Sequence, residues 1–159
     1  MRVAMVCLGN ICRSPMAAAV GAAIVEEAGL ADRVTVESFG TADYHVGSGA
    51  DRRAAAALRR RGWPADGHRA RCITAADIAE ADLVLASDHS NLGHLRRLAR
   101  SEEDRSKIRL LRSFDPAVTA SDDEVPDPWF GDDTDFDHAL ELIEAACRGL
   151  VEHLARTPR

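Results

Sequence analysis

The sequence has no apolar run close to the roughly 18 residues that a membrane-spanning helix requires. Its longest apolar-rich stretch runs from Met16 to Val25. Before it, Gly9, Asn10 and Arg13 interrupt the region in which a signal peptide would need an unbroken apolar segment. A composition of 46% hydrophobic and 29% charged residues is typical of a soluble globular protein. We therefore expect a cytoplasmic protein without a membrane partner.

An excess of positive charge is also missing, and so is any metal-binding pattern. The formal net charge of −6 argues against nucleic acid as a partner, because polyanion binding normally needs a basic domain or stripe. The four cysteines, Cys7, Cys12, Cys72 and Cys147, form neither a CxxC zinc pair nor a dense disulfide framework. No cluster of histidines and carboxylates has ligand spacing. The sequence therefore predicts reduced thiols, no metal and no cofactor.

Length and residue usage indicate one bacterial domain. A chain of 159 residues can bury enough surface to fold without disulfides or a metal, so we expect a single domain over residues 1–159. The twenty basic residues comprise nineteen arginines and one lysine, Lys107. Together with abundant alanine, this usage is typical of GC-rich coding DNA and indicates a bacterial source.

Strand and helix patterns alternate along the chain. The expected strands are 2–6, 34–39, 82–86 and 107–111, and the expected helices are 15–28, 51–61, 74–80, 87–99 and 135–155. Ser14 is the expected N-cap of the first helix, and Gly29 its end. The alternation favours right-handed crossovers and an α/β fold, with a parallel sheet covered by helices on both faces. Ligands bind beyond the carboxyl ends of such strands, where the loop from Cys7 to Ser14 would lie.

That loop places a cysteine and an arginine with five residues between them, after a strand and before a helix. It reads Cys7-Leu8-Gly9-Asn10-Ile11-Cys12-Arg13-Ser14. Its backbone N–H groups and the helix N-terminus can form a nest for a tetrahedral anion, to which Arg13 adds a bidentate fork. The same positive environment favours the thiolate of Cys7, to which Ser14 can donate a hydrogen bond. The loop therefore predicts attack of Cys7 on phosphorus and a phosphocysteine intermediate.

An acidic, proline-containing loop over residues 113–134 is too long to be a simple connection, which indicates a functional loop. Its segment Val125-Pro126-Asp127-Pro128-Trp129-Phe130-Gly131 holds Asp127 between two prolines, in stiff extended backbone. Phosphoryl transfer needs a proton for the leaving oxygen, and a positioned carboxylic acid can supply it. Asp127 is therefore the candidate acid. The plainer alternative is a turn aspartate, which is common between prolines.

Over essentially its whole length, the chain resembles the low-molecular-weight protein tyrosine phosphatases. That family carries a Cys-x5-Arg-Ser-Pro loop within its first two dozen residues and an Asp-Pro acid loop near residue 130. The resemblance implies a three-layer flavodoxin-like sandwich with a four-stranded parallel sheet. It also implies a metal-independent enzyme that acts on tyrosine-phosphorylated proteins and is inhibited by phosphate or other oxyanions.

The resemblance also assigns roles to residues of this sequence. Cys7 is the nucleophile, Arg13 the phosphate clamp, and Asp127 the general acid and then base. The remaining assignments are a phosphate-binding loop of Leu8, Gly9, Asn10, Ile11, Cys12 and Ser14, a substrate crevice walled by Tyr44, Trp129 and Phe130, and support of the loop by His68. For His68 the plainer alternative is simple exposure to solvent.

The sequence departs from the family pattern at two places. The acid loop often continues as Asp-Pro-Tyr-Tyr, whereas here Trp129 and Phe130 follow, which keeps aromatic walls but excludes regulatory tyrosine phosphorylation there. Asp88-His89-Ser90-Asn91 resembles the family's Met-Asp-x-Ser-Asn, but Ser87 stands where methionine is usual. We expect only a packing adjustment at Ser87.

Three other functions use related features. An arsenate reductase of this fold needs further cysteines to resolve its oxidised nucleophile, and Cys72 has no neighbouring cysteine. A protein-arginine phosphatase has a similar loop but tends to carry threonine in place of Ile11. A module that only captures phosphorylated ligands would need neither Cys7 nor Asp127.

Cys12 lies in the same curled loop as Cys7 but has no part in the catalytic steps. The curvature of the loop can bring the two Cα atoms within the ~4.4–6.8 Å that a disulfide tolerates. An exposed thiolate is readily oxidised to sulfenic acid, which a neighbouring thiol can trap. We therefore predict that Cys12 is the redox partner of Cys7. Packing of Cys12 against the first helix is the plainer alternative.

Overall fold

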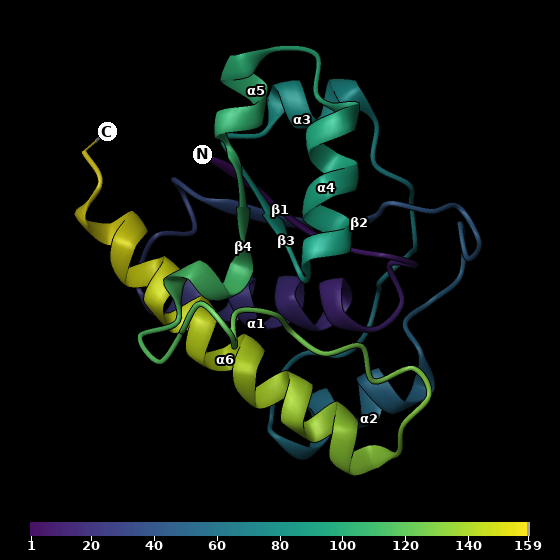
Figure 1. The fold of residues 1–159 in the computed structure, drawn as a ribbon. Coiled ribbons are helices and arrows are strands. Elements are labelled where there is room, and N and C mark those ends of the chain that lie inside the picture. The colour runs from purple at the N-terminus through teal and green to yellow at the C-terminus, as the bar shows by residue number, and fades with distance from the viewer. Residues whose placement is uncertain (159) are drawn as a thin grey trace.

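The fold is built on a four-stranded parallel sheet with the strand order β2-β1-β3-β4 (Figure 1). This computed structural model describes residues 1–158. Its strands are β1 (Arg2–Cys7), β2 (Thr35–Gly40), β3 (Leu83–Ala86) and β4 (Ile108–Leu110). In the register, Cys7 pairs with Gly40 of β2, and Val6 pairs with Ala86 of β3. The predicted parallel α/β sheet is confirmed, and its carboxyl end carries the loop that follows Cys7.

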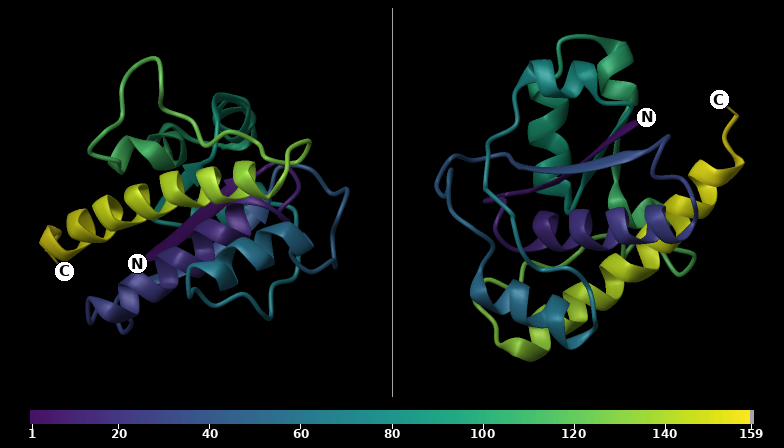
Figure 2. Two further views of the ribbon diagram at one scale, coloured as in Figure 1. Left: turned by 90° about the horizontal axis from the view of Figure 1, so that it is seen from below. Right: turned by 180° about the vertical axis from the view of Figure 1, so that it is seen from behind.

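Helices cover both faces of this sheet and make a three-layer sandwich (Figures 1 and 2). The helices are α1 (Arg13–Glu27), α2 (Arg52–Arg60), α3 (Ala75–Glu80), α4 (His89–Leu98), α5 (Glu102–Ser106) and α6 (Asp133–Arg156). Alternate residues of β1 point to opposite faces. Val3 and Met5 belong to the core beneath α1, α2 and α6, whereas Ala4 and Val6 belong to the core beneath α3 and α4.

The last helix buries a continuous apolar face and begins two residues earlier than expected. Its buried apolar residues include Phe136, Leu140, Ile143, Leu150, Val151 and Leu154. Helix α6 begins at Asp133 because Asp132 caps it and Asp135 closes a capping box with the backbone N–H of Asp132. The acidic residues of this segment therefore serve partly to start the helix.

The prediction that Ser14 caps the first helix is wrong. Helix α1 begins at Arg13, Cys12 occupies the N-cap position, and no side chain caps this terminus. The first backbone N–H groups of a helix lack an intrahelical partner and can serve an anion instead. The hydroxyl of Ser14 is turned toward Cys7, so it contributes to the site and not to the helix cap.

Two short elements were not expected, namely α5 and the 3-10 turn η1 (Leu111–Phe114). Helix α5 has no apolar periodicity to reveal it. It starts because Ser101 accepts a hydrogen bond from the backbone N–H of Asp104 and because acidic residues fill its first turn. Among residues 1–158, no helix combines the length and the apolar character needed to cross a membrane.

Candidate active site

The loop between β1 and α1 is shaped around Asn10. Asn10 has a φ of 57°, in the left-handed region that asparagine tolerates better than most residues, and it is fully buried. Its Nδ2 donates to the hydroxyls of Ser14 at 2.8 Å and Ser38 at 3.0 Å. Its Oδ1 accepts from the backbone N–H of Arg71 at 2.9 Å. One buried amide therefore ties the loop to α1, to β2 and to the segment before β3.

The thiol of Cys7 lies at the end of β1, with its Sγ 2.9 Å from the Oγ of Ser14. Because this oxygen already accepts a hydrogen bond from Asn10, the hydroxyl hydrogen of Ser14 is available to donate to the sulfur. Such a donor stabilises a thiolate more than a thiol. The Ser14 hydroxyl is therefore placed as a hydrogen-bond donor to the sulfur of the candidate nucleophile.

Gly40 permits the close approach of the loop to β2. A Cβ atom at Gly40 would lie 2.7 Å from the carbonyl oxygen of Leu8 and 3.1 Å from the backbone nitrogen of Asn10. The backbone N–H groups of Thr41 and Ala42 donate to the carbonyls of Cys7 and Leu8, both at 2.9 Å. Any side chain at position 40 would therefore displace the loop from its support.

His68 contacts the loop at the backbone of Asn10 and does not line the cavity that contains Cys7. Its Nε2 lies 2.6 Å from the carbonyl oxygen of Asn10 and must be the donor, because a carbonyl only accepts. Burial lowers the pKa of His68; the bond to Asn10 opposes this shift and the charge of Arg71 adds to it. At neutral pH the ring is therefore neutral, with its proton on Nε2.

Arg13 is buried at the start of α1 and is held by two acceptors. Its Nη1 donates to Oδ2 of Asp88 at 2.7 Å and to the carbonyl oxygen of Val125 at 2.9 Å. Asp88 is fixed in turn because its Oδ1 accepts from the backbone N–H of Asn91 at the start of α4. Nη2 lies 3.6 Å from Oδ2 of Asp127. The buried guanidinium therefore faces the candidate acid with its second nitrogen.

Asp127 lies in a tight turn of the acidic loop. Its Oδ1 accepts from the backbone N–H of Trp129 at 3.1 Å, and the N–H of Gly131 donates to the carbonyl of Pro128 at 2.8 Å. The carboxylate side chain is 44% exposed, whereas Val125 is fully buried and anchors the start of the turn. Asp127 is therefore accessible to a substrate while its backbone is held.

A cavity of about 280 Å³ joins these groups. It is lined by Cys7, Leu8, Gly9, Ile11, Cys12, Arg13, Tyr44, His45, Asp127, Trp129 and Phe130. The structure thus brings together every residue proposed from the sequence except Asn10, Ser14 and His68, which do not line the cavity but hold the loop by hydrogen bonds. At the mouth, Phe130 and Tyr44 are 97% and 74% exposed.

Three residues beside the cavity received no role from the sequence. His45 packs its ring against Trp129, with centroids 5.8 Å apart, and Asp88 orients Arg13. Arg53 donates to the carbonyls of Trp129 and Gly131. The position of His45 next to Tyr44 and the resemblance around Asp88 were the available signals. For the contacts of Arg53 with Trp129 and Gly131 no sequence signal existed, because these two residues lie more than seventy positions away.

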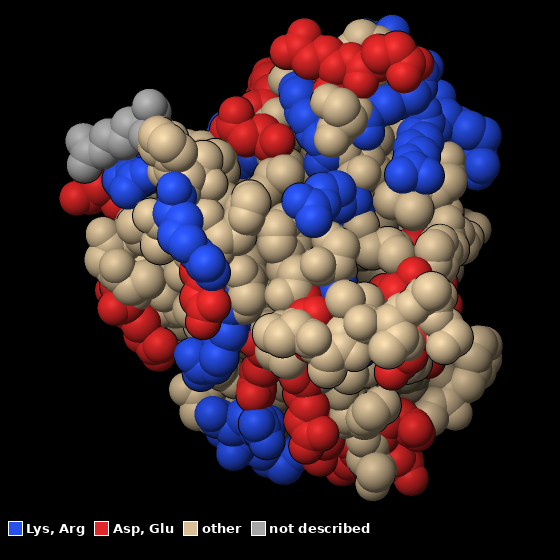
Figure 3. All heavy atoms as spheres, turned by 60° about the vertical axis from the view of Figure 1, so that its left-hand side comes forward, with Lys and Arg blue, Asp and Glu red and all other residues tan. Residues whose placement is uncertain are grey.

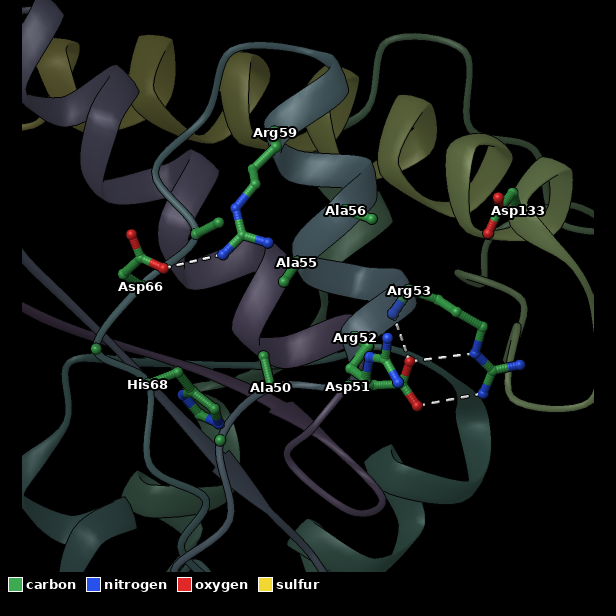
Figure 4. A pocket seen from close by; sticks show the side chains of 13 residues that line it. Ala50, Asp51, Arg52, Arg53, Ala55, Ala56, Arg59, Asp66, His68 and Asp133 are labelled. Carbon is green, nitrogen blue, oxygen red and sulfur yellow. Dashed lines mark hydrogen bonds and ion pairs between the residues drawn. The ribbon is translucent and has the colours of Figure 1, made fainter.

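A larger hollow of about 830 Å³ lies along α2 (Figure 4). Its lining contains no cysteine, and several of its charged groups already form pairs, Arg59 with Asp66 and Arg53 with Asp51. Asp51 and His68 line this hollow and also bind the backbone of the Cys7 loop, at Ile11 and Asn10. Despite its smaller size, the cavity that contains Cys7 is the candidate active site, because it alone of the two holds a nucleophile.

Comparisons with known proteins agree with this geometry. A family model described as "Low molecular weight phosphotyrosine protein phosphatase" matches residues 2–159. A Streptomyces coelicolor low molecular weight protein-tyrosine-phosphatase is 50% identical over 94% of this chain and 91% of its own length. A Mycobacterium tuberculosis low molecular weight protein-tyrosine phosphatase A is 44% identical over 98% and 95%.

Solved structures give the same result. A protein tyrosine phosphatase from Entamoeba histolytica superposes with a TM-score of 0.91 and 32% identity, covering 98% of this chain and 97% of that one. The family match spans nearly the whole sequence and so includes both the Cys7 loop and the Asp127 loop. The chain belongs to the low-molecular-weight phosphotyrosine protein phosphatase family.

Proposed function

We propose that this enzyme hydrolyses phosphotyrosine in proteins through a phosphocysteine intermediate. The observation that carries the proposal is the convergence of three groups in one cavity: the Cys7 thiol, the buried guanidinium of Arg13 and the carboxylate of Asp127, 3.6 Å from that guanidinium. A nucleophile, an anion clamp and an acid are the parts that cysteine-based phosphoryl transfer needs.

The reaction proceeds in two displacements. The Cys7 thiolate attacks phosphorus and forms the S–P bond while the bond from phosphorus to the tyrosine oxygen breaks, and Asp127 gives its proton to that oxygen. The Asp127 carboxylate then takes a proton from water as the water oxygen attacks phosphorus. Inorganic phosphate leaves, and the thiolate is restored with its donor Ser14 beside it. Arg13 and the N-terminus of α1 stabilise the negative charge of the phosphoryl oxygens in both steps.

The proposed partners are tyrosine-phosphorylated proteins, with phosphate and other oxyanions as inhibitors and no nucleic acid. The net charge of −6 argues against a nucleic acid partner. On the face in Figure 3, basic side chains gather in separate groups beside acidic ones, and uncharged surface lies between the groups at the upper right and the lower left. We further propose that the protein acts in the cytoplasm as a single domain over residues 1–159, as its composition and length indicate.

Specificity for aryl phosphates is the expected result of a turnover comparison between phosphotyrosine, phosphoserine and phosphoarginine. The thiol is buried below a mouth formed by Tyr44, Trp129 and Phe130, so a long, flat side chain reaches it and phosphoserine is too short. Ile11 lines the same cavity, and we expect Ile11→Thr to raise phosphoarginine hydrolysis relative to phosphotyrosine hydrolysis. A preference of the unmodified enzyme for phosphoarginine would refute this assignment of substrate.

Cys12 is proposed to protect Cys7 from irreversible oxidation. Peroxide converts the Cys7 thiol to a sulfenic acid and releases water, and the Cys12 thiol then displaces a second water to form the disulfide. Both cysteines line the cavity. Burial, followed by the charges of Asp51 and Cys7, raises the pKa of Cys12 to about 12, so little of it is thiolate at neutral pH and trapping should be slow.

After exposure to peroxide, mass spectrometry should find the Cys7–Cys12 disulfide, and dithiothreitol should restore activity. Bound phosphate should slow the inactivation because it covers Cys7. Cys12→Ser is the control, and its activity should be recovered less completely. If this variant recovers as fully as the parent, Cys12 does not protect the enzyme and the proposal is wrong.

A further inference from the structure

We propose that Arg53 is a positioning residue that holds the Asp127 loop over the phosphate-binding loop, an inference that rests on the proposed role of Asp127 as the acid. Arg53 lies in the first turn of α2, outside the cavity that contains Cys7. Its Nη1 donates to the carbonyl oxygens of Trp129 at 3.0 Å and Gly131 at 3.1 Å. A single side chain therefore holds both ends of the aromatic segment that follows Asp127.

The other edge of the guanidinium is tied to Asp51. Nε and Nη2 of Arg53 donate to the two carboxylate oxygens of Asp51 at 3.1 and 3.2 Å, which Figure 4 shows at the start of α2. The backbone N–H of Asp51 donates in turn to the carbonyl oxygen of Ile11 at 2.8 Å. The first turn of α2 thus contacts both loops of the site and fixes one relative to the other.

The contact reaches the acid through Trp129. The carbonyl of Trp129 accepts from Arg53, and the N–H of the same residue donates to Oδ1 of Asp127 at 3.1 Å. The guanidinium also lies over the Trp129 ring at 5.5 Å and over the fully buried Phe136 ring at 4.6 Å. Arg53 thus holds Trp129 at its backbone and its ring, and with it the N–H that binds the Asp127 carboxylate.

This set of contacts requires arginine. Its planar group offers five donors and a flat face, which here serve two carbonyls, one carboxylate and two rings at once. A lysine could reach only some of these partners. The plainer explanation is that Arg53 merely stabilises α2 by pairing with its cap Asp51. The two explanations differ in whether the loss of Arg53 impairs proton transfer by Asp127.

Arg53→Gln separates them, because the backbone N–H of residue 53 still donates to Asp51 at 2.8 Å and preserves the helix cap. Displacing a catalytic group by about 1 Å can cost up to about 100-fold in rate. We expect kcat/KM for phosphotyrosine, which reports the step that releases the leaving group, to fall about 10- to 100-fold, and kcat/KM for an aryl phosphate with an acidic leaving group to change little. Vanadate affinity should be unchanged, because Arg13 and the loop remain.

The matched control is Arg52→Gln. Arg52 is exposed in the same helical turn, and its side chain makes no hydrogen bond or ion pair with any of residues 1–158. It should retain the activity of the parent on both esters. Arg53→Lys, which retains the charge and some donors, replaces Arg53→Gln in the comparison if the latter unfolds at the assay temperature, and the same dependence on leaving group is expected.

A double-mutant cycle with Asp127→Ala completes the test. If Arg53 acts through Asp127, adding Arg53→Gln to Asp127→Ala should lower the rate of phosphotyrosine hydrolysis little further. Two results would overturn the positioning role: an equal loss of rate on both esters from Arg53→Gln, or a loss in the Asp127→Ala background as large as in the parent. Neither result would contradict the proposed function. If the effect of Asp127→Ala alone does not depend on the leaving group, Asp127 is not the acid, and the inference about Arg53 is wrong as well.

Discussion

Cys7→Ser is expected to abolish turnover while leaving the binding of phosphate or vanadate nearly intact. An alcohol in this position is not ionised and is a far weaker nucleophile than a thiolate. Asn10 still shapes the loop, and Arg13, held by Asp88, still provides its charge. Hydrolysis of an aryl phosphate and direct calorimetric titration with vanadate measure the two properties separately.

Cys72→Ser is the matched control, because Cys72 is only partly buried and does not line the cavity that contains Cys7. It should keep the turnover of the parent. Residual activity of Cys7→Ser above a few per cent would move the nucleophile to another residue. Chelators should leave the unmodified enzyme unaffected, and inhibition by them would point to a metal requirement that the sequence does not predict.

The fold could be predicted from the sequence because its signals are local. The apolar run of β3 and the periodic apolar residues of α6 need only their own segment to be recognised. The helix that starts at Arg52 was found because Asp51 caps it, accepting from the N–H of Arg53. Helix α5 was missed because its five residues are all polar and its start depends on a single serine hydroxyl.

The candidate site was predictable only in part, for the same physical reason. Cys7, Arg13 and Asp127 were predicted because each belongs to a short sequence motif that indicates its chemical role. The cap role of Ser14 was wrong because Ser-Pro is also common at the start of a helix, and only the fold shows that the Ser14 hydroxyl accepts from Asn10 and faces Cys7. Contacts such as Arg53 to Trp129 join residues 76 apart, so no local pattern records them.

Asp127→Ala is expected to lower turnover of phosphotyrosine by about 10²–10⁴-fold, the range typical of a positioned general acid. The tyrosine oxygen is a poor leaving group unless it is protonated as the bond to phosphorus breaks, and the partly exposed carboxylate lies 3.6 Å from Arg13 where that oxygen would emerge. The defect should shrink steadily along a series of aryl phosphates with increasingly acidic leaving groups. Measured kcat/KM across that series gives the slope directly, because it reports the step that releases the aryl group and not the later hydrolysis of the phosphocysteine.

Asp127→Asn distinguishes loss of the proton from loss of the loop. The amide oxygen of asparagine can still accept from the N–H of Trp129, as Oδ1 of Asp127 does at 3.1 Å, so the turn and its aromatic residues should stay in place. The amide has no acidic proton to give. If Asp127→Asn lowers the rate of hydrolysis as much as Asp127→Ala does, with the same dependence on the leaving group, proton transfer is the function lost. If Asp127→Asn keeps most of the activity, or if the defect is equal across the series, Asp127 shapes the loop and the acid must be sought elsewhere.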